Sequence, residues 1–194
     1  ATAVGVGLDV GILIAKEGDV EGNVSGAALS DASVTANAVA RGIDAGGDAD
    51  AIDNRGEIQL ATSSDATGVA ASLEVAGSLA AKGGVEGEVT GKAMSNSSTN
   101  TYAETTGIDG GEDSDHILNT GDMSLLRAES NSTGVSASLN ISAGVAANGD
   151  AKVNVTGEAA SNATVTAEAS NSAIKGGSGN DEIINSGDFF NARS

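Results

Sequence analysis

Nine consecutive residues, 176 to 184, have the types and the spacing needed to bind a metal ion. They read Gly-Gly-Ser-Gly-Asn-Asp-Glu-Ile-Ile. Glycine accepts backbone conformations with positive φ, so successive carbonyl groups can turn toward one point. The aspartate adds an anionic oxygen of the kind that Ca²⁺ prefers. The aliphatic residue two places later predicts that the chain re-enters a sheet, so the pattern indicates a glycine-acid turn able to hold a hard cation.

Two earlier copies of this turn occur at nearly constant spacing. The step along the chain from Gly46 to Gly111 is almost equal in length to the step from Gly111 to Gly177. All three copies continue as Ile-x-Asn-x-Gly-x-apolar. The candidate Ca²⁺ ligands at the three turns are Gly46, Asp48, Asp50, Gly111, Asp113, Asp115, Gly177, Gly179, Asn180 and Asp181.

The same residues have a second interpretation without a metal. Glycine, aspartate and asparagine form tight turns because they tolerate the left-handed region and bond their own backbone. Two carboxylates on one turn repel each other unless a cation lies between them, which favours the metal. If each repeat forms one rung, successive turns lie about 4.8 Å apart and can share an ion. If each repeat forms three rungs, about 14 Å separates them.

The turns belong to a longer repeat that covers the whole chain. We place the repeats at 1–65, 66–131 and 132–194, as one continuous array, because Leu8, Leu73 and Leu139 also recur in register. Each repeat opens with a period-two alternation of apolar and small residues, which is typical of a strand. In the first repeat this strand runs from Val4 to Ile14 and has a length of about 33 Å.

The remaining segments also favour strands. Turns such as Asn148-Gly149 predict a hairpin, with the second strand antiparallel to the first. Polar clusters such as Ser63-Ser64-Asp65 are expected to close each repeat, and no stretch has helical periodicity. The sequence predicts an all-β, solenoid-like repeat array, related to β-helices and β-rolls, with long strands. The alternative is a set of tandem antiparallel β-sandwich-like repeats.

Two sets of equivalent residues carry structural expectations. Asn54, Asn119 and Asn185 either form a hydrogen-bonded ladder inside a solenoid or act as turn residues before a glycine. Ile52, Ile117 and Ile183 are expected to point inward. Ile117 should be the best buried because its repeat has a neighbour on both sides.

Composition limits the function. The 194 residues include 28 glycines, no proline, cysteine or tryptophan, and 2% aromatic residues, so the core must consist of small side chains. The absence of cysteine excludes disulfides and thiolate metal sites. A net charge of −18 disfavours nucleic acid and anionic membranes as partners. No apolar run approaches the roughly 18 residues of a membrane span, and the chain starts within the pattern, as expected of a piece of a longer protein.

Catalysis has little support in the sequence. His116 is the only histidine, and the equivalent residues are Ala51 and Glu182. A Ser-His-Asp arrangement would depend on that one residue. Sites for sugar hydrolysis usually present aromatic platforms, and Tyr102 is nearly alone. We therefore expect that the protein is not an enzyme.

Residues 176–184 resemble the RTX, haemolysin-type calcium-binding repeat. The Ile-x-Asn-x-Gly continuation resembles rungs of β-helical bacterial surface proteins, and together the two resemble the repeat region of a very large secreted bacterial adhesin. The resemblance implies Ca²⁺-dependent folding outside the cell, after export of the unfolded chain. The expected function is a stalk or spacer segment of such a protein, in which each repeat contacts its neighbours and a surface or glycan is a further partner.

Two other functions stay open. The first is an adhesion module whose flat Thr/Ala/Ser face recognises a carbohydrate, a surface or ice. Only the second repeat has the regular threonines that such a face needs, Thr99 and Thr101. The second is an enzyme of β-helical fold, which would need acids and bases clustered in one repeat only.

Overall fold

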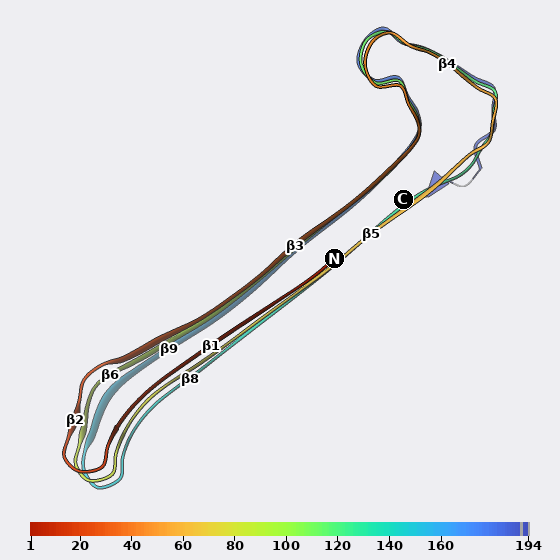
Figure 1. Cartoon of the computed structure of the whole chain (residues 1–194). Coiled ribbons are helices and arrows are strands. Elements are labelled where there is room, and N and C mark those ends of the chain that lie inside the picture. The colour runs from red at the N-terminus through yellow and green to blue at the C-terminus, as the bar shows by residue number, and fades with distance from the viewer. Residues whose placement is uncertain (191, 194) are drawn as a thin grey trace. The chain divides into compact units, whose positions relative to one another are not determined.

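The computed structural model describes residues 1–190 and 192–193, and its regular elements are all β-strands (Figure 1). No helix in these residues is long and apolar enough to cross a membrane. The strands are β1 (Thr2–Ala15), β2 (Val20–Glu21), β3 (Val24–Asp44), β4 (Ala51–Asn54), β5 (Ile58–Ala80), β6 (Val85–Asp109), β7 (His116–Asn119), β8 (Met123–Ala146), β9 (Ala151–Lys175), β10 (Glu182–Asn185) and β11 (Ala192–Arg193).

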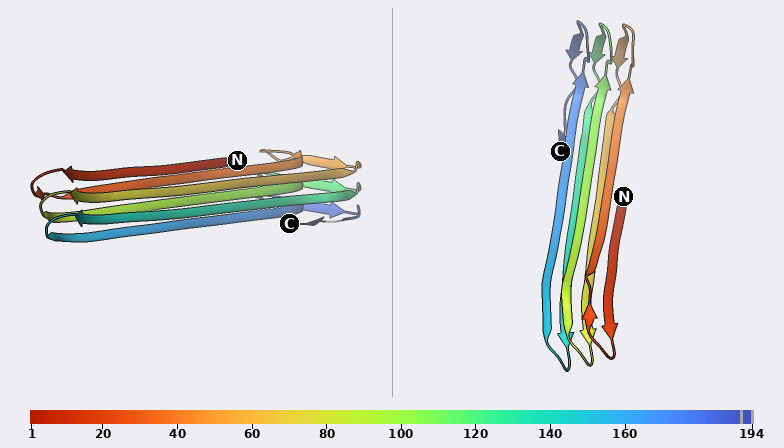
Figure 2. Two further views of the ribbon diagram at one scale, coloured as in Figure 1. Left: turned by 90° about the horizontal axis from the view of Figure 1, so that it is seen from below. Right: turned by 90° about the vertical axis from the view of Figure 1, so that its left-hand side faces the viewer.

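Each strand pairs with its equivalent in the neighbouring repeat, in parallel and in register. Strand β1 pairs with β5 so that Thr2 lies opposite Thr67. Strand β7 lies between β4 and β10, with Ile117 opposite both Ile52 and Ile183. Figure 2 shows the equivalent strands side by side. Paired residues are therefore separated by one full repeat of the sequence, and one repeat forms one rung.

The strands form three sheets. The first has the order β1-β5-β8-β11, and the second is the short sheet β10-β7-β4. In the third, β6 pairs with β2 and β3 as well as with β9. The prediction of an all-β, solenoid-like array with long strands is confirmed. The alternative of antiparallel sandwich-like repeats is wrong, because the strands pair in parallel between repeats.

Two local expectations are also wrong. The turn after β1 does not make an antiparallel hairpin, since β1 pairs with β5 and the chain passes into another sheet. A chemically equivalent strand in the next repeat offers a full-length partner that keeps like side chains on one face. Residues 63–65 do not close a repeat but lie within β5. The sheet accepts Ser64 because its hydroxyl donates to the Ala36 carbonyl at 2.7 Å.

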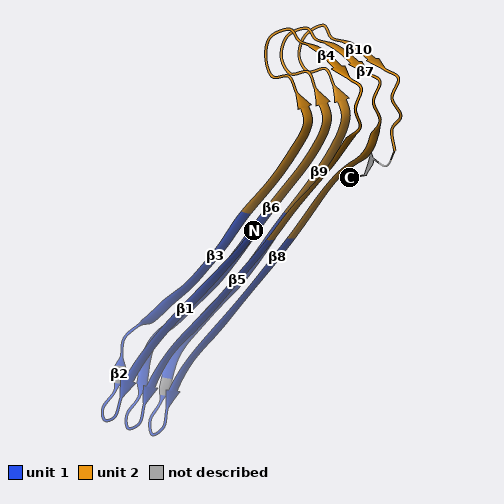
Figure 3. Ribbon diagram, turned by 45° about the vertical axis from the view of Figure 1, so that its right-hand side comes forward, with its two compact units in different colours: residues 1–34, 67–99, 133–165 blue, residues 35–66, 100–132, 166–194 orange. Residues whose placement is uncertain are grey.

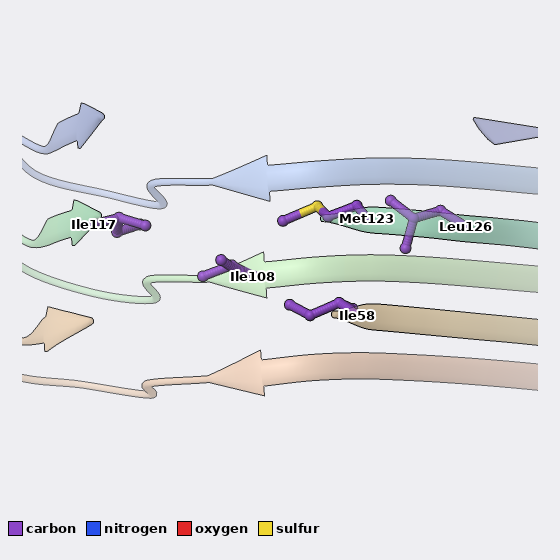
Figure 4. Packing of buried hydrophobic residues seen from close by; sticks show 5 residues of the cluster. All are labelled: Ile58, Ile108, Ile117, Met123 and Leu126. Carbon is purple, nitrogen blue, oxygen red and sulfur yellow. The ribbon is translucent and has the colours of Figure 1, made fainter. Parts of the chain in front are cut away.

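The chain divides into two compact units, and each unit takes a segment from all three repeats (Figure 3). Unit 1 comprises residues 1–34, 67–99 and 133–165, and unit 2 comprises residues 35–66, 100–132 and 166–194. Unit 2 contains an aliphatic cluster, shown in Figure 4, of Ile58, Ile108, Ile117, Met123 and Leu126.

The three equivalent isoleucines follow the expected order of burial. Ile117 is fully buried in the unit 2 cluster, and Ile52 is partly buried against it. Ile183 is 46% exposed. The central position is therefore the best buried, as predicted.

Unit 1 has a different interior, in which small polar residues replace aliphatic ones. The hydroxyl of Ser95 lies 2.7 Å from that of Ser136 and 2.9 Å from that of Ser138. A Cβ on Gly5 or Gly7 would collide with the backbone of the facing strand β3. The two sheets thus approach too closely for large side chains, and the aliphatic side of β1 faces outward.

Candidate metal centre

The glycine-acid turns have the backbone conformation that the sequence predicts. Gly46, Gly111 and Gly177 have φ values of 91°, 99° and 103°. Two positions later φ is again positive, at 72° for Asp48 and 67° for Asp113, and Gly179 holds this place in the third turn. Positive φ is strained for a residue with a side chain, so the third turn, with glycine there, is the least strained of the three.

The last acid of each turn lies in a column with its equivalents in the other rungs. The backbone N–H of Asp50 donates to Asp115 Oδ1 at 2.8 Å. The N–H of Asp115 donates to Asp181 Oδ1 at 3.0 Å. We call Asp50, Asp115 and Asp181 the aspartate column. It lies within unit 2, and Asp115, at its centre, is buried.

One oxygen of two column carboxylates lacks a partner. Oδ2 of Asp50 and Oδ2 of Asp115 are buried and accept no hydrogen bond from the described residues. A Cβ at Gly110 would lie against Asp115 Oδ2, and a Cβ at Gly176 against Asp181 Oδ2. The first glycine of the motif therefore leaves room for the carboxylate. These two glycines were missed as site residues, although they open the second and third motifs; the first motif has Ala45 in this place.

No protein cation balances the aspartate column within the described part of the chain. A nearby buried acid in unit 2 shows the contrast. Asp109 lies 3.2 Å from Arg41 Nε and 3.5 Å from Lys175 Nζ, so its charge is compensated. The column has no such ion pair among the described side chains, and unpaired buried charge is unfavourable. A bound cation is one way to balance it.

Other features limit what such a site can offer. The carbonyls of Gly46 and Gly111 already accept hydrogen bonds from the next rung, at 2.8 and 2.9 Å. The side chains of Asp48 and Asp113 lie exposed at the turns, as does Asn180, and they do not join the column. Within the described residues no three acidic or histidine side chains converge on one point. An ion here would be held by few carboxylate oxygens, with water completing its shell.

Other sequence candidates lie apart from this site. His116 is exposed, with Nδ1 3.1 Å from Glu182 Oε2. Thr99 and Thr101 are buried, so these two threonines do not belong to a recognition face. The period-two alternation places both on the inner side of β6.

Another buried acid, Glu74 in unit 1, is not predicted by the sequence. Its side chain is fully buried, and neither carboxylate oxygen has a partner among the described residues. Burial raises its pKa above the ordinary value, and the charge of Asp9 raises it further. A Cβ on Gly26 would collide with this carboxylate, so the facing glycine provides its space.

Comparison with known proteins adds no relative: no protein-family model, curated protein or solved structure matches the chain significantly.

Proposed function

We propose that the protein is a structural segment of a large extracellular bacterial surface protein, a stalk or spacer whose glycine-acid turns bind Ca²⁺. The observation that carries the proposal is the aspartate column, with buried oxygens on Asp50 and Asp115 that lack a partner among the described residues. A hard cation binds such oxygens. Its chemistry would be charge neutralisation, which couples ion binding to the stability of unit 2.

A structural role agrees with the equivalence of the rungs. The long strands have 21 to 25 residues, and the pairing described for β1 and β5 is uninterrupted over 14 residues. Each added rung extends the stack by only about 4.8 Å, so reach along the stack needs many repeats. What the repeat supplies is a dense ladder of backbone hydrogen bonds, suited to bearing load.

The affinity for calcium should be low. With few protein oxygens available, we expect dissociation constants of roughly 10⁻⁴–10⁻³ M, the range of extracellular modules. A site with this affinity would be occupied only where calcium is abundant, as it is outside cells, where we propose that the protein acts. Inside a cell the same site would remain largely empty.

Calcium titration tests this proposal. We expect heat of binding at millimolar Ca²⁺ and a lower melting temperature after addition of EDTA. Asp115→Asn should lose both responses, because it removes the central carboxylate of the column. Asp109→Asn is the matched control: it should destabilise the protein by breaking the pairs with Arg41 and Lys175, but keep the calcium response. No heat and no EDTA effect in the unmodified chain would reject calcium binding.

A second candidate function is recognition of a glycan or other surface, and a specific depression favours it. A hollow of about 640 Å³ on the outer face of β3, β6 and β9 is lined by Leu29, Asp31, Met94, Asn96, Ser161 and Asn162, among others. Amides and a carboxylate beside aliphatic side chains suit a sugar ring. Binding of soluble oligosaccharides that Asn96→Ala abolishes would support this function. Equal binding by the variant would count against it.

A further inference from the structure

The outer face of sheet β1-β5-β8 in unit 1 is aliphatic and uncharged. On each strand every second side chain points outward, and the three strands place equivalent residues side by side. We call this surface the aliphatic face. Its residues are Val4, Val6, Leu8, Val10, Ile12, Ile14, Val69, Ala71, Leu73, Val75, Gly77, Leu79, Val135, Ala137, Leu139, Ile141, Ala143 and Val145.

The aliphatic face is open to solvent. On β1 the exposed fractions are 77% for Val6, 66% for Leu8 and 68% for Ile14. On β8, Leu139 is 54% exposed. A contiguous apolar surface of this kind marks an interaction site in a soluble protein. In a chain of net charge −18, a face with no charged side chain selects an apolar partner.

The face has a relief made of tall and low rows that run from strand to strand. We name each row by the number of its β1 residue, and we call a row tall where its side chains are large and low where they are small. Row 10, formed by Val10, Val75 and Ile141, is tall. Row 12 is low because it carries Gly77 and Ala143 beside Ile12, and the resulting groove of about 240 Å³ is lined by rows 10, 12 and 14. Row 8 (Leu8, Leu73, Leu139) and row 14 (Ile14, Leu79, Val145) are tall. Row 6 is low because it contains Ala71 and Ala137.

We propose that a second copy of this chain packs on the aliphatic face, around a two-fold axis through row 10. Such an axis places row 8 of one copy opposite row 12 of the other, and row 14 opposite row 6. Away from the axis, the tall rows 8 and 14 then meet the low rows 12 and 6, and at the axis row 10 of one copy packs against row 10 of the other. A two-fold interface requires this self-complementarity, and interdigitated side chains form a dry contact as in a steric zipper.

The area suits a specific but modest dimer. Residues 4 to 14 span about 33 Å, and three strands are roughly 14 Å wide. The projected contact is thus about 460 Å² per copy, or roughly 900 Å² for both, before the relief of the side chains is added. Specific interfaces begin at about 1000 Å² of total buried surface. In projection three rungs therefore fall just short of this limit, and the relief of the side chains adds contact area beyond the projection.

Sedimentation equilibrium over a range of concentrations up to roughly 100 µM tests the proposal. We expect a reversible dimer for the unmodified chain and a monomer for Ile141→Asp, which places a charge in row 10. Leu29→Asp, at an aliphatic position on the outer face of β3 that is 64% exposed against 49% for Ile141, is the control and should dimerise normally. Circular dichroism checks that each variant keeps its strands. A monomeric unmodified chain, or a dimeric Ile141→Asp variant, would overturn the proposal.

A second variant distinguishes between two kinds of occupant of the aliphatic face: a second copy of the chain, and a lipid surface or other flat apolar partner. Ala143→Leu fills the groove of row 12 without adding charge, so the tall row of a second copy no longer fits. We expect weaker dimerisation of this variant by at least tenfold. If the unmodified chain instead binds neutral phosphatidylcholine vesicles as a monomer, and Ala143→Leu binds them more tightly, the occupant is a lipid surface and the dimer is rejected.

Discussion

Asn54 donates a side-chain hydrogen bond from Nδ2 to Oδ1 of Asn119, at 2.6 Å, across one rung. Asn119 repeats this bond to Asn185 Oδ1, also at 2.6 Å. Each amide also donates to the carbonyl two residues later, at Gly56, Gly121 and Gly187. The two interpretations of these asparagines are therefore both correct, since each residue forms the turn and the ladder together.

We predict that Asn119→Ala destabilises the protein by about 2–3 kcal/mol. The substitution leaves the Nδ2 of Asn54 and the Gly121 carbonyl short of a buried partner, and each such group costs about 1–3 kcal/mol. Asn185→Ala is the matched control, because Asn185 is exposed. The change also takes an acceptor from Asn119 Nδ2, but this bond lies at the exposed end of the ladder, where water can replace it. The cost should therefore be smaller, about 1 kcal/mol. Urea unfolding measures both, and equal losses would mean that the ladder adds nothing at its centre.

The burial of the equivalent isoleucines predicts a second difference in stability. Ile117→Ala should cost about 2–5 kcal/mol, the usual loss for a buried aliphatic side chain that leaves a cavity. Ile183→Ala should cost less, because Ile183 is 46% exposed. Urea unfolding of the two variants side by side gives the comparison. A larger loss at Ile183 would indicate that the repeats fold as separate domains.

The turn glycines allow a matched test of backbone conformation. At Gly111 φ is positive, and a Cβ would collide with the Gly46 carbonyl oxygen of the adjacent rung. Gly47, in the first turn, has nothing within 4 Å of such a Cβ. Gly111→Ala should therefore lose about 1–3 kcal/mol from strain alone and more from the collision. Gly47→Ala should be nearly neutral in thermal unfolding, and similar melting temperatures for the two variants would contradict this packing.

Glu74 should make the stability of the protein depend on pH. Its pKa is raised from about 4.5 by burial and by Asp9, so the folded state holds a proton that the unfolded chain releases. The contribution of Glu74 to stability is thus greatest below its pKa in the unfolded state, and it falls as pH rises through its pKa in the folded state. Glu74→Gln should raise the melting temperature at pH 7, and its advantage should shrink toward pH 4.5. The exposed Glu86→Gln is the control, and a pH-independent difference for Glu74→Gln would argue against a buried charge.

The repeat was the feature that the sequence predicted best. Equivalent turns at 46, 111 and 177, together with the period-two alternation, were enough to predict an all-β stack. The same equivalence predicted that Ile117 is better buried than Ile183. The number of rungs per repeat could not be obtained in this way, because spacing along the chain does not state which strands pair. The register of Thr2 with Thr67 resolves it.

The interior of unit 1 was beyond prediction from the pattern. Alternation defines two faces of β1 but not which one points inward, and aliphatic residues usually take the buried face. Here the glycines of β1 and Gly26 of β3 allow the sheets to approach closely. The small and polar side therefore became the interior, with Glu74 enclosed in it. The sequence predicts the aspartate column only in part, because its pattern groups Asp48 and Asp113 with acids that the fold places elsewhere.

Pairs of introduced cysteines can establish whether one repeat forms one rung of the stack. Asn96 and Asn162 lie on neighbouring strands of unit 1, with Asn162 Nδ2 donating to Asn96 Oδ1 at 3.3 Å. Parallel neighbours are about 4.8 Å apart, within the range for a disulfide, and the chain has no cysteine of its own. Mild oxidation of dilute Asn96→Cys/Asn162→Cys should give a complete intramolecular disulfide, measured by mass spectrometry. The offset pair Asn96→Cys/Ala163→Cys should give none, because it places the second cysteine on the opposite face. No disulfide in the first pair, or equal yields in both, would contradict the stacking of single-rung repeats.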